Sequence, residues 1–104
     1  MAPITTKVAI VTGAAGGMGR AISLRLAEDG FDVAVNDIRG TPELDRLIQE
    51  IKSKGRRSIG VPADISLESE VEGMIQKVVQ ELGSLDVACC SAAGTVASWC
   101  SHVQ

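Results

Sequence analysis

Aromatic residues are almost absent from this chain. Its 104 residues include one Phe, one Trp and no Tyr. The hydrophobic fraction is nevertheless 45%, which is enough for a globular core. That core has to be built from Val, Ile, Leu, Ala and Met, and the length allows one small domain but not two.

Long apolar runs and a large excess of either charge sign are missing too. No apolar run approaches the ~18 residues that a membrane span needs. The first six residues lack the basic start and the apolar core of a secretory signal. The formal net charge is only −3 and is spread along the chain, which argues against a nucleic-acid surface. We therefore expect a cytoplasmic protein that binds neither nucleic acid nor membranes.

Cysteine is scarce, and no Cys-x-x-Cys spacing occurs. The three cysteines are Cys89, Cys90 and Cys100. Reduced, partly buried thiols are the simple interpretation. A metal site completed by His102 is the alternative, but adjacent cysteines do not easily bind one ion. We predict no metal site.

Glycine, by contrast, is concentrated in one stretch. Four glycines lie within seven positions, at 13, 16, 17 and 19, between an apolar run (residues 8–11) and an amphipathic segment. Strand, glycine turn and helix together favour a phosphate site, because the backbone can approach a pyrophosphate and the helix N-terminus attracts anions. We predict that Gly13 makes the turn, while Gly17 and the N–H of Met18 approach the pyrophosphate. Gly19 allows the helix to pack closely on the strand. A glycine-rich turn without a ligand is the alternative.

Strand and helix patterns alternate along the rest of the chain. The expected strands cover about residues 7–11, 32–36, 58–62 and 85–90. The expected helices run from 17 to 29, from Pro42 with Thr41 as its cap, and from beyond Ser66, the expected cap of the third helix. The first helix is expected to bury Met18, Ala21, Ile22 and Leu26, and the third Val71, Met74, Ile75, Val78, Val79 and Leu82. Apolar strands in such alternation indicate a parallel sheet, which right-handed crossovers arrange in the order 3-2-1-4.

Two acidic residues follow the second and third predicted strands. Asp37 lies about 20 residues after the glycine turn, where a carboxylate can accept both ribose hydroxyls of an adenosine and repels a 2′-phosphate. This favours NAD over NADP, although Arg39 could hold such a phosphate, and a solvated loop acid is the alternative. Asp64 could accept the adenine amino group, or form an Asx turn ahead of Ser66.

These motifs together resemble the short-chain dehydrogenase/reductase family. The likeness rests on Thr12 to Gly19, on Asp37, on Ala63-Asp64-Ile65 and on Leu85-Asp86-Val87, and it covers residues 4 to 87. The overall sequence pattern is similar to that of the acetoin/diacetyl reductase and 3-oxoacyl-carrier-protein reductase branches. The resemblance implies that the NAD(P) site is lined by Gly13, Gly17, Met18, Gly19, Asp37, Asp64 and Ile65.

The likeness weakens after Val87. The family continues with Asn-Asn-Ala-Gly or a close variant, whereas residues 88–94 here read Ala-Cys-Cys-Ser-Ala-Ala-Gly. The family also uses a catalytic Ser and a Tyr-x-x-x-Lys pair, in which Tyr donates a proton to the carbonyl and Lys lowers its pKa. This chain has no Tyr, and its last lysine is Lys77. We therefore predict no catalytic residue, and a frameshift, alternative splicing or a gene-model error is our hypothesis for the divergence.

The expected fold class is α/β, a Rossmann-type doubly wound parallel sheet truncated after about four strands. Residues 1–90 would form the NAD(P)-binding half-domain, and residues 91–104 an irregular tail. The first hypothesis for function is dinucleotide binding within an oxidoreductase whose full-length form transfers hydride to or from a small carbonyl or alcohol. The second is a non-catalytic nucleotide-binding or interaction module, or a non-functional product. The exposed apolar fourth strand could pair with a full-length relative.

Overall fold

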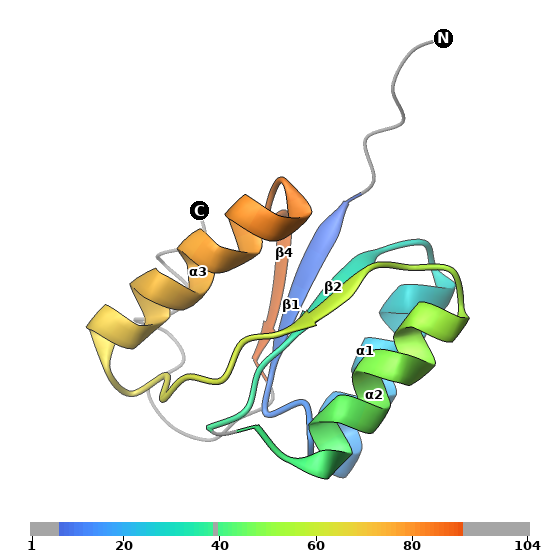
Figure 1. Cartoon of the computed structure of the whole chain (residues 1–104), viewed down its shortest axis with the longest axis horizontal. Coiled ribbons are helices and arrows are strands. Elements are labelled where there is room, and N and C mark those ends of the chain that lie inside the picture. The colour runs from blue at the N-terminus through green and yellow to red at the C-terminus, as the bar shows by residue number, and fades with distance from the viewer. Residues whose placement is uncertain (1–6, 39, 91–104) are drawn as a thin grey trace, which may run out of the picture.

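The computed structural model describes residues 7–38 and 40–90. Strands and helices alternate along this part of the chain, and Figure 1 shows the sheet lying between its helices. The elements are β1 (Val8–Thr12), α1 (Gly17–Glu28), β2 (Asp32–Val35), α2 (Pro42–Ser53), β3 (Ser58–Gly60), α3 (Glu68–Leu82) and β4 (Val87–Cys90).

The sheet has the predicted topology. Its order is β3-β2-β1-β4, and every pair of neighbouring strands is parallel. β1 lies at the centre, where Ile10 pairs with Ala34 of β2 on one side and with Ala88 of β4 on the other. All five residues of β1 are buried, because a parallel sheet with helices on both faces leaves no strand face to solvent at its centre. All four strands therefore end at the same edge of the sheet.

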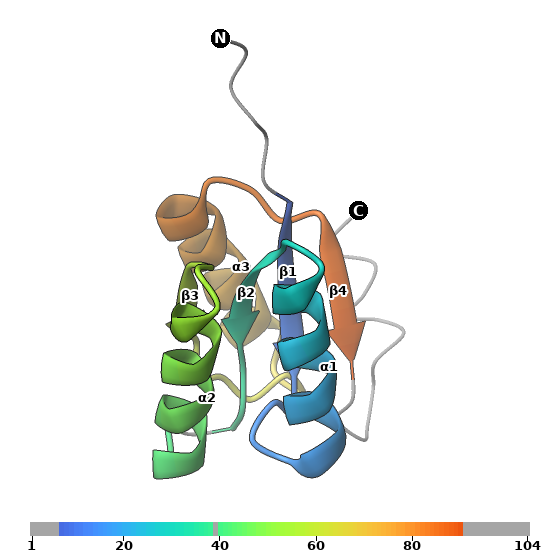
Figure 2. The ribbon, with the colours of Figure 1, turned by 90° about the vertical axis from the view of Figure 1, so that its right-hand side faces the viewer.

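Within the described ranges, the two faces of the sheet carry different numbers of helices. α1 and α2 cover one face and α3 covers the other, as the two views at right angles show (Figures 1 and 2). Because side chains alternate across a strand, Val8 and Ile10 of β1 join the core under α3, whereas Val11 joins the core under α1 and α2. The aliphatic core expected from the composition is thus divided into two layers.

The predicted buried face of α1 is wrong in part. Ile22 is half-buried against the core, but Met18 is 72% exposed and Ala21 is exposed. The fully buried positions of α1 are instead the small residues Gly19, Ser23 and Ala27. Small side chains bring α1 close to the sheet, so hydrophobicity alone does not identify the packed face of this helix.

α2 begins and packs as its sequence predicts. The Thr41 hydroxyl accepts a hydrogen bond from the Leu44 N–H at 3.2 Å, and Pro42 occupies the first turn. Leu44, Leu47 and Ile51 are buried, and full burial of such a side chain contributes about 1.5–3 kcal/mol. Local capping and tertiary packing therefore support the same helix.

The prediction that Ser66 caps α3 is wrong. Leu67 is the N-cap residue and makes no side-chain capping bond, because the Ser66 hydroxyl donates to Asp64 at 2.6 Å instead. The predicted core stripe is correct at Val71, Met74, Val78 and Leu82, with Ile75 half-buried, but Val79 is 43% exposed. α3 therefore does not bury every apolar residue that it carries.

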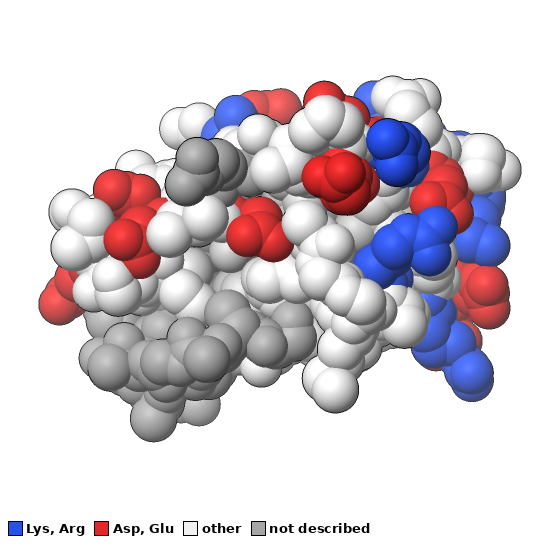
Figure 3. Space-filling model, turned by 90° about the horizontal axis from the view of Figure 1, so that it is seen from below, with Lys and Arg blue, Asp and Glu red and all other residues white. Residues whose placement is uncertain are grey.

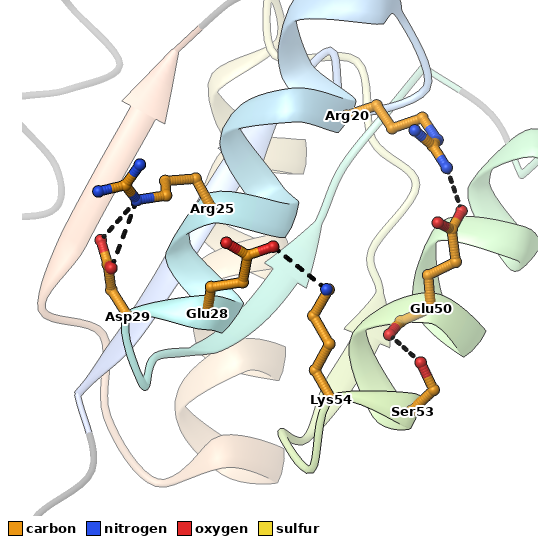
Figure 4. Close-up of polar contacts among 7 residues, drawn as sticks. All are labelled: Arg20, Arg25, Glu28, Asp29, Glu50, Ser53 and Lys54. Carbon is orange, nitrogen blue, oxygen red and sulfur yellow. Dashed lines mark hydrogen bonds and ion pairs between the residues drawn. The ribbon is translucent and has the colours of Figure 1, made fainter.

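α1 and α2 are joined across their outer surfaces by ion pairs. Figure 4 shows the Arg20 guanidinium directed at the Glu50 carboxylate, and the Lys54 ammonium directed at Glu28 at 3.2 Å. All four side chains are substantially exposed, so each pair contributes at most about 1 kcal/mol. These pairs therefore add little to the stability of the fold.

Acidic residues near the amino ends of the strands serve the fold. The Asp86 carboxylate accepts hydrogen bonds from the Val8 N–H at 2.9 Å and from the Ser84 hydroxyl at 3.0 Å. The buried Asp32 carboxylate accepts two bonds from Arg57, each at 2.9 Å. Both acids are paired within the chain, which leaves the opposite edge as the candidate for ligand binding. No helix in the described ranges combines the length and hydropathy that crossing a membrane requires.

Candidate functional site

The glycine turn joins the carboxyl end of β1 to α1. Gly13 has φ +65°, a left-handed conformation that favours glycine, and its carbonyl accepts a bond from the Gly16 N–H at 3.2 Å. Gly16 is the N-cap of α1 and supplies no side-chain bond, and the first turn contains no acidic residue. The positive end of the α1 dipole is therefore not neutralised by a side chain of this helix.

Gly17 and Gly19 are glycines for different reasons. A Cβ on Gly19 would lie 2.3 Å from the Gly13 carbonyl oxygen, so only glycine fits where α1 crosses the end of β1. The close packing predicted for Gly19 is confirmed by this geometry. Outside its own helix and chain neighbours, a Cβ on Gly17 would meet none of the described residues within 4 Å, so their packing does not require glycine there.

Two large apolar side chains are exposed beside the turns at this edge. Met18, the second residue of α1, is 72% exposed, and Ile38, which follows β2, is 60% exposed. Exposed hydrophobic side chains scattered singly are ordinary. Here the two residues lie next to the glycine turn and next to Asp37, which the sequence predicts to bind the dinucleotide.

Asp37 lies against the glycine turn. One carboxylate oxygen accepts a hydrogen bond from the Ala15 N–H at 3.1 Å, and the other accepts one from the Ile38 N–H at 2.8 Å. The structure thus brings the predicted ribose acceptor and the predicted pyrophosphate turn together, although they are 22 residues apart. Since both bonds come from backbone N–H groups, they hold the turn without using another side chain.

Asn36 is a residue that the sequence analysis missed. Its buried side-chain amide donates to the carbonyl oxygens of Val61 at 2.8 Å and of Ala63 at 3.3 Å. Its backbone carbonyl accepts a bond from the Ala14 N–H at 2.8 Å. One residue therefore links the ends of β1 and β2 to the segment after β3. The sequence signal was an amide directly after the apolar residues 33–35.

Asp64 forms the Asx turn that the sequence left open as an alternative. Its Oδ1 accepts bonds from the Ser66 N–H at 3.0 Å and from the Ser66 hydroxyl at 2.6 Å. The Ser66 hydroxyl, followed by the Ser66 N–H, lowers the pKa of the Asp64 carboxyl below its ordinary value. The carboxylate is therefore ionised at neutral pH and acts as an acceptor. Ile65 beside it is half-buried against the core under α3.

Figure 3 looks onto this edge from below the view of Figure 1. Basic side chains gather on the side of α1 and α2, and acidic side chains extend from there across to the α3 side. This face therefore carries both signs of charge. A ligand that combines an anionic group with neutral hydrogen-bonding groups fits such a surface better than a long polyanion does.

The cysteines of β4 lie on opposite faces of the sheet. Cys89 packs with the core under α1 and α2, and Cys90 with the core under α3. Burial raises the pKa of the Cys89 thiol, which lowers its reactivity. Within residues 7–38 and 40–90, no three His, Cys, Asp or Glu side chains are grouped to hold a metal ion. Cys100 and His102 lie outside the described residues.

Comparison with known proteins relates the chain to short-chain dehydrogenases and reductases. A family model described as short chain dehydrogenase matches residues 7–103. The match continues past Val87, after which the sequence motifs of the family weaken. A short-chain dehydrogenase/reductase of Armillaria gallica is 54% identical over 87 residues, which are 83% of this chain and 33% of the relative. A 3-oxoacyl-[acyl-carrier-protein] reductase of Staphylococcus aureus is 46% identical over 82 residues, 79% of this chain and 33% of the relative.

A solved structure shares the fold described above. Carveol dehydrogenase from Mycobacterium avium, in complex with NAD, superposes with a TM-score of 0.77 and 30% identity. The match covers 84% of this chain and 35% of that protein. The chain thus spans about a third of the length of the relatives that it matches.

Proposed function

Because this chain belongs to the short-chain dehydrogenase family, we propose that the carboxyl edge of its sheet binds the adenosine and pyrophosphate of a nicotinamide dinucleotide. When bound, the dinucleotide supplies or accepts the hydride in the chemistry of such oxidoreductases. The proposed binding residues are Gly13, Gly17, Met18 and Gly19 at the pyrophosphate, Asp37 at the ribose, and Asp64 and Ile65 at the adenine.

The observation that carries this proposal is the open space at Gly17. This residue is the first of α1, and a Cβ there would lie more than 4 Å from every described atom outside its chain neighbours and the backbone of its own helix. The helix N-terminus at the same point has no side-chain cap and no acidic first turn. A glycine without a packing role among the described residues, at a helix N-terminus that carries no acidic side chain of its own helix, suits the approach of a pyrophosphate to the backbone.

Asp37 supports NAD rather than NADP. Its carboxylate lies at the end of β2 and is held against the glycine turn by the Ala15 N–H. A fixed negative charge at that position accepts ribose hydroxyls and repels a 2′-phosphate. The NAD complex of carveol dehydrogenase, whose structure this chain resembles, fits the same preference.

We propose that these 104 residues bind the dinucleotide without turnover, in the cytoplasm. They contain no tyrosine to donate a proton to a carbonyl. Hydride transfer to or from a small carbonyl or alcohol is proposed for the whole protein. Addition of NADH with diacetyl or acetoin tests this: no absorbance loss at 340 nm is expected, and turnover would overturn it.

The binding proposal is tested by one matched pair of variants. Gly17→Ala is expected to weaken NADH binding at least about tenfold, equivalent to about 1.4 kcal/mol, while the urea midpoint of unfolding is maintained. Gly73→Ala is the control, because Gly73 also lies in a helix and its added Cβ would likewise meet no described residue outside that helix within 4 Å. NADH fluorescence measures binding, and tighter binding of NADH than of NADPH is expected. A wild-type chain that binds neither would overturn the proposal.

The edge of β4 favours a second candidate function, association with a full-length relative. Within the described residues β4 pairs only with β1, and its four residues are all half-buried and uncharged. An apolar edge without charged residues readily accepts another strand. Light scattering of the chain mixed with the full-length relative tests this, with a mixed complex expected and two separate masses contradicting it.

A further inference from the structure

Both polar atoms of the peptide group that precedes Asp64 are held by side chains from other elements. The Ala63 carbonyl accepts a bond from the buried Asn36 amide at 3.3 Å. The Asp64 N–H donates to Glu70 Oε1 at 2.7 Å. The peptide plane is thus held by Asn36, directly after β2, on one side and by Glu70 of α3 on the other, which restricts the backbone from which the Asp64 side chain extends.

Glu70 makes this bond outside its own helix. It is the third residue of α3, and in an ordinary capping box its carboxylate would return to the N–H of the N-cap residue. That residue is Leu67, whose N–H donates to the Asp64 carbonyl at 3.0 Å instead. The Glu70 carboxylate reaches past the cap to the Asp64 backbone. Its position therefore serves the segment before the helix as well as the helix.

The carboxylate of Asp64 keeps one oxygen for a ligand. Among the described residues, both bonds to this carboxylate come from Ser66 and end on Oδ1. The side chain is held by the Ser66 bonds and the backbone by Asn36 and Glu70. This leaves Oδ2 at a defined position beside the carboxyl ends of the strands.

We propose that Glu70 is a positioning residue for adenine recognition: it holds the Asp64 backbone so that Oδ2 accepts a hydrogen bond from the adenine amino group. This inference rests on the dinucleotide binding proposed above. Glu70 itself touches no ligand in this proposal, and it acts only through Asp64.

The test compares NAD with nicotinamide hypoxanthine dinucleotide, in which a carbonyl oxygen replaces the adenine amino group. The wild-type chain is expected to prefer NAD by about tenfold, the value of one hydrogen bond to a charged group. Glu70→Ala is expected to reduce that preference severalfold. Glu70→Gln keeps an acceptor oxygen and should preserve it. Glu72→Ala, which removes an exposed carboxylate from the same helix, should leave it unchanged.

The outcomes separate this inference from the function on which it rests. A wild-type chain that binds neither dinucleotide overturns the proposed function. A wild-type chain that binds both equally overturns the role of Asp64 and therefore that of Glu70. An equal loss of affinity for both dinucleotides in Glu70→Ala indicates a structural role only and also overturns the inference. A selective loss of the NAD preference, rescued by Glu70→Gln, supports it.

Discussion

α1 and α2 begin at the same edge of the sheet but complete their N-termini in opposite ways. α2 has the Thr41 hydroxyl on the Leu44 N–H and the acids Glu43 and Asp45 in its first turn. α1 begins at Gly16 with no side-chain cap and no acid in its first turn. The positive end of α2 is satisfied by its own side chains, which serves stability. The first turn of α1 receives no such side-chain bond from its own helix, and a neighbouring carboxylate, that of Asp37, bonds to the Ala15 N–H before the helix. The N–H groups of this first turn therefore suit an anionic ligand.

The largest effect is expected from adding a side chain where the backbone of α1 lies against the end of β1. Gly19→Ala would place a Cβ 2.3 Å from a backbone oxygen, and we expect a loss of about 3 kcal/mol in the free energy of unfolding. Urea denaturation followed by circular dichroism measures it. Gly16→Ala is the control, because its Cβ would lie at an ordinary 3.6 Å from the same oxygen. Equal midpoints for the two variants would refute the packing argument.

The next effect comes from giving α1 an N-terminus like that of α2. Gly16 already has the extended conformation of an N-cap residue, with φ −79° and ψ 166°, so Gly16→Asp fits the backbone. We expect a gain of a few tenths of a kcal/mol in stability, but about a tenfold loss of NADH affinity through repulsion of the pyrophosphate. Gly16→Asn, which has the same shape without the charge, should lose less affinity. Similar affinity losses in both variants would exclude a charge effect.

A smaller effect is expected from removing the cap of α2. Thr41→Ala should cost about 1 kcal/mol of stability, because the Leu44 N–H loses its acceptor. Thermal unfolding measures this loss, and Thr41→Ser should restore most of it. NADH affinity, measured on the same samples, should not change. A parallel loss of affinity would mean that the two N-termini are not independent.

The smallest effect is expected from a substitution at Ser66, which precedes α3 and bonds to Asp64. Ser66→Ala removes the hydroxyl that lowers the pKa of Asp64, so that pKa should rise toward its ordinary value. A lowered carboxyl pKa contributes stability above the ordinary pKa, and this contribution disappears as the pH falls through the lowered value. The difference in stability between wild type and variant should therefore vanish on acidification. Carbon-detected NMR titration of the Asp64 carboxyl measures the shift, and an unchanged pKa would contradict the assignment.

Local signals predicted most of the fold. Thr41 and Pro42 mark the start of α2 through short-range chemistry, and the apolar strands with intervening helices give the parallel order of the sheet. Ser66 shows where such signals fail. Its hydroxyl can cap a helix or bond to a nearby carboxylate, and the carboxylate of Asp64 competes successfully for it. Met18 fails for another reason, because α1 approaches the sheet along Gly19 and its small neighbours.

Only part of the candidate site could be predicted from the sequence. The glycine turn and the acids after β2 and β3 stood out because each is tied to a local motif. The bond from Ala15 to Asp37, and the bonds of Asn36 and Glu70 around residues 61–64, depend on which strand ends meet in space. No sequence pattern marks an amide that bonds to carbonyls 25 or 27 residues away.

The central strand has a consequence for the order of folding. β1 is made first, yet β4, its neighbour on one side, lies almost 80 residues later, as the bond between Val8 and Asp86 shows. During synthesis the emerging chain can pair β1 with β2 early, because only one helix separates them. The other side of β1 has to wait for β4 to leave the ribosome. Of the four described strands, β4 is therefore the last to pair with β1, and amide exchange of a nascent chain stalled before residue 87 should find β1 protected from one side only.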